Sequence, residues 1–519
     1  MTKLGDQYFA LSRFFQFTLW FALIFLIKFD TVLEPPVWDT AMGVFPPAIF
    51  LYETNFDVLE LVKQPDWWEG GANGRHSFSL WTWFIALVMS VTHSPTITFA
   101  VLHITTFAIN AFAISVFVRV LFQYKAAPWL ALISGLFLLL IPLVLVQIGY
   151  IYTESLVMSL GILAWASWHK NHESRAVMFA LLAVSMKLTG IVILICISAV
   201  LLMRLLNGFS CKRLLLLISM PLILFILISI DVWLGELPPT HGMNWGGRDA
   251  LVGALRGRSS RTPEILYLIY AGLLAALAHV YLQWRQHPDV NLVRLLKHHT
   301  AEEGGRFIAL VFPFVFVSGT IVLALSGSLF LNRYMIPIIP FSMIQIVLFT
   351  QIKNLQKILV VLFVMGCLVS IYNHNGVLYR ASKSFSVVEI SHAYKAYYLA
   401  QKKIIEEVEK LDENVPIYVS REIDYMMSHP MMGYASGIKP HINGIYKPRY
   451  ANMSLENFPS DFYAVVSHPS HGGSRLKKLI READKSEKWN AESVYEQDIG
   501  GYEMYIKRVS KFEKLKSVR

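Results

Sequence analysis

The chain has 519 residues, of which 55% are hydrophobic and only 16% are charged. Soluble domains average about 25% charged residues, so this composition excludes an ordinary soluble protein and predicts a polytopic α-helical membrane protein. The formal net charge of +10 is shared between residues 1–372 and residues 373–519 rather than gathered in one basic segment, so we expect no nucleic-acid partner. The three cysteines lie in or beside apolar segments, which leaves no disulfide framework in the C-terminal part.

The first apolar segment, residues 14–33, has the length of a membrane span and no small-residue cleavage site, so we interpret it as uncleaved. The sequence VLEPPVWDTAMG follows, in which two prolines end the helix. Asp39 stands just beyond them, between Trp38 and Thr40. Two interpretations are open for Asp39: a solvated loop carboxylate or helix cap, and a general base held at the membrane surface.

Ten further apolar segments predict helices of roughly span length. They cover residues 97–122, 128–148, 155–168, 176–186, 190–206, 214–234, 264–284, 307–331, 334–350 and 355–372. Residues 77–91 are short and rich in Trp and Ser, so we expect a helix along the membrane interface. If this segment does not cross, the basic connectors share one side, and the positive-inside rule predicts eleven spans with the N-terminus inside.

The same topology places several ionisable residues at span ends on the outer face. Glu154 lies in GYIYTES, Lys187 in SMKLTG and Arg333 in LNRYMIPIIP. An outer loop, residues 234–261, breaks the charge rule with four arginines: Arg248, Arg256, Arg258 and Arg261. Ionisable residues are costly at such depths and often functional. Arginine and lysine suit a lipid phosphate, and a carboxylate on the same face can accept a proton from a nucleophile.

Each of these residues also has a purely structural interpretation. Glu154 would cap a helix that begins at Ser155, Lys187 would extend to the interface, and Arg333 would anchor a span. The aromatic segment PDWWEGG is interpreted as an interfacial anchor. No phosphate-binding glycine motif is present, and no internal repeat of the kind found in many transporters.

These motifs, in this order, resemble the membrane-embedded GT-C glycosyltransferases, which include the protein O-mannosyltransferases and the lipid A aminoarabinose transferases. The resemblance covers roughly residues 10–372. It rests on Asp39 after the first span, on an interfacial segment with Arg75 and His76, on Thr153-Glu154-Ser155, on Lys187-Leu188-Thr189-Gly190, and on Arg333-Tyr334 followed by Pro337 and Pro340.

The resemblance implies an inverting transfer of a sugar from a polyprenyl-phosphate donor to an acceptor hydroxyl, which belongs to a lipid, a glycan or a protein. It implies a bacterial inner-membrane protein working on the outer face among membrane lipids. The implied roles are catalysis for Asp39 and Glu154, acceptor or loop contacts for Arg75 and His76, and donor phosphate binding for Lys187, Arg333, Tyr334, Arg258 and Arg261.

Two departures from the family pattern concern a metal. Thr40 follows Asp39 where many relatives have a second acidic residue, and Glu154 stands where relatives often have aspartate. A divalent metal is therefore left open, and no other cofactor is expected.

Charge density rises near residue 371, and residues 373–519 hold nearly half of the charged residues in little more than a quarter of the length. We therefore predict a transmembrane GT-C-like catalytic domain over residues 1–372, with residues 34–96 as an outer loop carrying interfacial helices. Residues 373–519 should form a small α/β domain outside. Its predicted helices cover residues 385–412 and 474–485, and its predicted strands lie in 414–420, 461–468 and 502–509.

Two other classes of function are open from the sequence. A transporter or lipid flippase would use the same charges to line a translocation path, and a polysaccharide-assembly scaffold would carry out no chemistry. The gathering of charges at one face, rather than through the depth of the membrane, favours the enzyme, as does the large outer domain.

Overall fold

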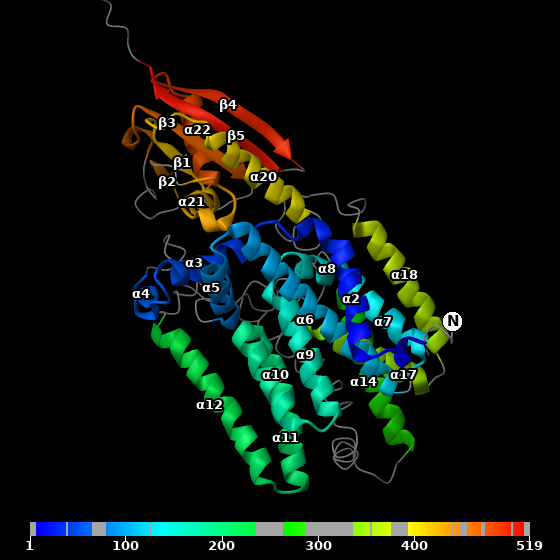
Figure 1. The fold of residues 1–519 in the computed structure, drawn as a ribbon. Helices are drawn as coiled ribbons and strands as arrows, with labels where there is room; N and C mark the ends of the chain where they lie inside the picture. The colour runs from blue at the N-terminus through cyan, green and yellow to red at the C-terminus, as the bar shows by residue number, and fades with distance from the viewer. Residues whose placement is uncertain are drawn as a thin grey trace, which may run out of the picture. The chain divides into compact units, whose positions relative to one another are not determined.

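The structure is a computed structural model that describes residues 7–37, 40–64, 79–124, 126–234, 263–286, 336–352, 355–374, 393–437, 441–445, 454–468, 473–499 and 502–512. These residues are mostly helical, with a small sheet near the C-terminus (Figure 1). The chain divides into two compact units. The first comprises Met1–Val32, Phe78–Trp81 and Val101–Leu378, and the second Leu33–Ser77, Thr82–Ala100 and Tyr379–Arg519.

The helices that lie wholly or largely in the first unit follow the apolar segments of the sequence. They are α2 (Arg13–Lys28) with η1 (Phe29–Thr31), α6 (Pro95–Gln123), α7 (Pro128–Leu140), α8 (Pro142–Gly149), α9 (Thr153–His169), α10 (Glu173–Met186), η4 (Leu188–Gly190), α11 (Ile191–Asn207), α12 (Cys211–Leu234), α14 (Pro263–Gln286), α17 (Ile339–Ile352) and α18 (Gln356–His374). The predicted segment 307–331 lies outside the described residues.

By length and composition, two helices of the described residues can cross a membrane: Arg13–Thr31 and Pro95–Gln123. The pair α7 and α8 makes a third if it counts as one span. The number of eleven spans therefore stays a prediction.

The predicted span over residues 128–148 consists of two helices in the structure. The helix breaks at Ile141, and α7 and α8 meet at an angle of 63°. Pro142 is the physical reason, because it lacks a backbone N–H and disfavours the helical conformation for the residue before it. Ile141 accordingly has φ −56° and ψ 120°.

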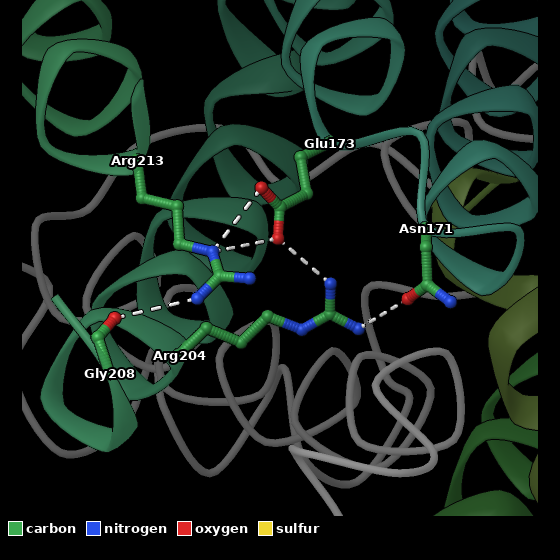
Figure 2. Close-up of polar contacts among 5 residues, drawn as sticks. All are labelled: Asn171, Glu173, Arg204, Gly208 and Arg213. Atoms are coloured by element: carbon green, nitrogen blue, oxygen red, sulfur yellow. Dashed lines mark hydrogen bonds and ion pairs between the residues drawn. The ribbon is translucent and has the colours of Figure 1, made fainter. Parts of the chain in front are cut away.

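One end of α10 is joined to α11 and α12 by a network of ion pairs (Figure 2). The Glu173 carboxylate accepts hydrogen bonds from Arg204 at 2.9 Å and from Arg213 at 3.0 Å. Arg204 also donates to Asn171 Oδ1 at 2.8 Å, and its guanidinium lies 4.5 Å from the ring centre of Trp168. The charges suit the helix dipoles, because Glu173 is in the first turn of α10 and Arg204 in the last turn of α11.

The second unit combines the segment after α2 with the C-terminal part of the chain. Its N-terminal elements are the π-helix η2 (Thr40–Val44), α3 (Phe45–Glu53), α4 (Val58–Lys63) and most of α5 (Leu80–Thr92). Its C-terminal elements are α20 (Ala393–Val408), β1 (Ile417–Val419), α21 (Arg421–Ser428), η6 (Pro430–Met432), β2 (Ile442–Gly444), η8 (Leu455–Asn457), β3 (Asp461–His468), α22 (Gly473–Asp484), β4 (Trp489–Ile499) and β5 (Tyr502–Lys511).

The five strands form one mixed sheet in the order β2-β1-β3-β5-β4. β1 pairs in parallel with β2 and β3, while β5 pairs antiparallel with β3 and β4. Side chains alternate between the faces of a strand. Phe462 and Val466 of β3 thus pack with Leu476 of α22 on one face, while Ser467 accepts a hydrogen bond from Gln401 of α20 on the other. The two helices cover opposite faces of the sheet.

Candidate functional site

A buried ion pair lies in the first unit between two residues that the sequence motifs singled out. Lys187 Nζ is 2.6 Å from Glu154 Oε1. The Glu154 side chain is fully buried and that of Lys187 is 13% exposed. Thr153 Oγ1 donates to the other carboxylate oxygen of Glu154 at 3.2 Å. The lysine, expected as a lone cation for a phosphate, thus already has a carboxylate partner.

Helix ends place these two charges together. Glu154 is in the first turn of α9, and Lys187 is the C-cap residue of α10, which packs along α9. A carboxylate at a helix N-terminus and an ammonium at a helix C-terminus both interact favourably with the helix dipoles. The helix begins at Thr153 with Tyr152 as its N-cap, so Glu154 does not have the capping role considered from the sequence.

The corner after Lys187 explains the residues of the KLTG motif. A Cβ atom on Gly190 would lie 2.3 Å from the backbone of Ala183, so only glycine allows this close approach of the turn to α10. Ser79 Oγ donates to the carbonyl of Met186 at 2.9 Å and ties the same corner from another segment. Thr189 Oγ1 is buried and has no hydrogen-bond partner among the described residues.

The corner before Glu154 contains two features that the motifs did not reveal. Ile151 has φ +61°, a conformation that is strained for a β-branched residue and often found near functional sites. Lys28 is only 2% exposed, and its side chain lies so close to Gly149 that a Cβ there would be 3.0 Å from it. The sequence did contain one signal for Lys28: a lysine inside an apolar segment is energetically costly, and such residues are often functional.

The backbone on either side of Asp39 is described in the second unit, whereas Trp38 and Asp39 themselves lie outside the described residues. On one side, Glu34 through Val37 are buried. On the other, η2 (Thr40–Val44) is a π-helix, a rare form that is frequent at functional sites. The amides of Thr40 and Ala41 both donate to the carbonyl of Val37, at 3.2 and 3.3 Å.

The other predicted site residues fall outside the described part of the chain. They are Arg75, His76, Arg258, Arg261, Arg333 and Tyr334. Within the described residues there is also no group of three or more His, Cys, Asp or Glu side chains that could hold a metal ion.

Two solved structures share the fold of this chain. Both are structures of ArnT, which is a lipid A aminoarabinose transferase and a GT-C enzyme. The crystal structure of ArnT from Cupriavidus metallidurans bound to undecaprenyl phosphate matches with TM-score 0.50 and 11% identity, over 95% of this chain and 97% of that chain. The apo crystal structure matches with TM-score 0.51, at the same identity and coverage.

No protein-family model matches the chain, and no curated protein matches it by sequence. The likeness to ArnT therefore shows the fold, and it confirms the fold that the resemblance from the sequence motifs implied.

Proposed function

We propose that this chain is an integral-membrane glycosyltransferase that moves a sugar from a polyprenyl-phosphate donor to an acceptor hydroxyl. The observation that carries the proposal is the buried Glu154–Lys187 ion pair, held at a glycine-dependent corner. The shared fold supports the donor class, because one ArnT crystal structure contains undecaprenyl phosphate.

The reaction needs a base at the acceptor and a cation at the leaving group. The acceptor oxygen forms a bond to the anomeric carbon as the bond between that carbon and the phosphate oxygen breaks, and the acceptor proton passes to a carboxylate. The donor is a phosphodiester with one negative charge, and the released lipid phosphate is a monoester with up to two. A fixed cation therefore stabilises the transition state more than the ground state.

We assign the base to Asp39 and the leaving-group cations to Lys187 and Arg333. Both oxygens of Glu154 already accept bonds, from Lys187 and Thr153, so the geometry supports Glu154 as the residue that orients the lysine. The remaining donor contacts are proposed for Tyr334, Arg258 and Arg261, and the acceptor or loop contacts for Arg75 and His76. Metal dependence is left open.

We further propose eleven spans in a bacterial inner membrane, with the N-terminus inside and residues 373–519 outside. Cysteine labels at His93 and Tyr150 should then react from the outer side, and labels at Lys125, His172 and Ser210 only from the inside, because the basic connectors stay in the cytoplasm. The check is labelling of intact cells with a membrane-impermeant thiol reagent after replacement of the exposed Cys211. Labels at His93 and Tyr150 that react from opposite sides would rule out this topology.

Reconstitution in proteoliposomes separates the enzyme from a transporter. With a polyprenyl-phosphate sugar in the membrane and an acceptor extract outside, we expect stoichiometric release of lipid phosphate and appearance of glycosylated acceptor. A flippase would instead move the intact donor between leaflets without releasing lipid phosphate, and a scaffold would do neither. Acceptor fractions prepared from lipid, glycan and protein identify the acceptor class.

A further inference from the structure

The C-terminal part of the second unit makes a direct hydrogen bond to the segment that leads to Asp39. The Tyr434 hydroxyl donates to the carbonyl oxygen of Pro36 at 2.9 Å, across 398 positions of sequence. The Tyr434 side chain is buried, and burial raises the pKa of its hydroxyl well above the usual value. The hydroxyl therefore stays protonated and donates over the whole physiological pH range.

A second contact at the same place comes from the neighbouring residue. Gly433 has φ +74°, and a Cβ atom there would lie 2.5 Å from the Phe99 ring and 3.5 Å from Pro35. Only glycine combines this backbone conformation with so close an approach. The turn formed by Gly433 and Tyr434 is thus closely packed against the proline segment.

An ion pair and a hydrogen bond flank these contacts. Lys395 Nζ lies 3.9 Å from the buried carboxylate of Glu34, and His429 Nδ1 lies 3.4 Å from Glu53. Both join a C-terminal residue to the segment around Asp39. Since the His429–Glu53 pair is partly exposed, we expect the buried contacts of Tyr434 and Gly433 to dominate the stability of this contact.

We propose that Tyr434 is a positioning residue, through which the C-terminal domain holds the Glu34–Val37 segment and thereby restrains the described backbone on either side of Asp39. This inference rests on the proposed function, because the role of Asp39 belongs to that function. The connection is short: Tyr434 holds Pro36, and the next residue, Val37, accepts the amides of Thr40 and Ala41. The domain therefore acts on the reaction without contacting the substrate.

The first test is hydrogen exchange of the full chain in nanodiscs. Tyr434→Phe removes one hydroxyl and leaves the ring, so exchange of the Thr40 and Ala41 amides should become about 2- to 10-fold faster, as expected for the loss of one ordinary hydrogen bond. Exchange in α4 should not change. The matched control is Tyr398→Phe, because this ring lies 5.9 Å from Tyr434 and its hydroxyl makes no hydrogen bond among the described residues. Unchanged exchange at Thr40 and Ala41 in Tyr434→Phe would overturn the proposal.

The second test is a double-mutant comparison of turnover. Tyr434→Phe alone should lower kcat about tenfold with an unchanged donor KM, because a displaced base slows chemistry without weakening donor binding. In the Asp39→Asn background, Tyr434→Phe should lower kcat no further, since its effect passes through Asp39. Additive losses would show a merely structural role and contradict the proposal. Normal activity of Asp39→Asn alone would refute the assignment of the base, while the exchange result would stand independently.

Discussion

We expect Asp39→Asn to lower turnover by about 10²- to 10⁴-fold, the usual contribution of a general base. Asparagine keeps the shape of the side chain and most of its hydrogen bonding but cannot accept the proton of the acceptor hydroxyl. Donor binding should change little, because the lipid phosphate is assigned to cations elsewhere. The measurement is transfer rate against donor concentration in proteoliposomes, which separates kcat from KM.

Two further variants sharpen the test of Asp39. Asp39→Glu should also be slow, because one extra methylene displaces the carboxylate. Asp57→Asn is the control in the same outer segment: its side chain caps α4 by accepting the amide of Glu60 at 3.0 Å, and asparagine caps helices equally well. It should be nearly as active as the unmodified chain.

Near-normal transfer by Asp39→Asn would make this residue an ordinary loop carboxylate. The sequence then offers Glu34 and Glu154 as bases. Both are poor candidates in the structure, since Glu34 is buried near Lys395 and Glu154 is fully buried against Lys187.

Elements with a strong local pattern were predictable from the sequence. The strand DFYAVVSH was expected at residues 461–468 and is β3 (Asp461–His468), because its alternate residues face two covered sides of the sheet. The helix α22 was equally clear from its stripe of apolar residues. By contrast, β4 was missed, because it is an edge strand in which only Trp489 is buried and the remaining residues show no alternation.

The sequence predicted which residues belong to the candidate site, but it did not predict how their side chains pair in space. Sequence position suggested that Glu154 and Lys187 lie at span ends on one face, but their direct pairing depends on how α9 packs against α10, over 33 positions of sequence. Tyr434 and Pro36 are still farther apart in the sequence, and no local sequence pattern predicts their contact. Local periodicity indicates elements, whereas such pairings are set by tertiary packing.

The direct pairing changes what a test of Lys187 must look like. Lys187→Met alone leaves the fully buried Glu154 without its partner, and breaking a buried ion pair costs about 3–5 kcal/mol of stability. Lost activity in that variant would therefore not separate phosphate binding from folding. The double variant Glu154→Gln with Lys187→Met removes both charges, so it leaves no unpaired buried charge, which is the main cost of breaking a buried ion pair.

We expect the double variant to keep its unfolding temperature within a few degrees while donor use, measured as kcat/KM, falls roughly 10- to 150-fold, the equivalent of a charge-assisted contact of about 1.5–3 kcal/mol. Glu154→Gln alone keeps the lysine charge and removes its competing carboxylate. The donor should then bind at least as tightly, while turnover falls because the lysine is less well oriented.

The control is Glu173→Gln, the same change in an ion pair with Arg204 whose side chains are both 9% exposed. It should lower the unfolding temperature and leave donor KM unchanged, because this pair only joins helices. Full donor use by the double variant would show that the Glu154–Lys187 pair is likewise a structural connection and that the lipid phosphate is bound elsewhere.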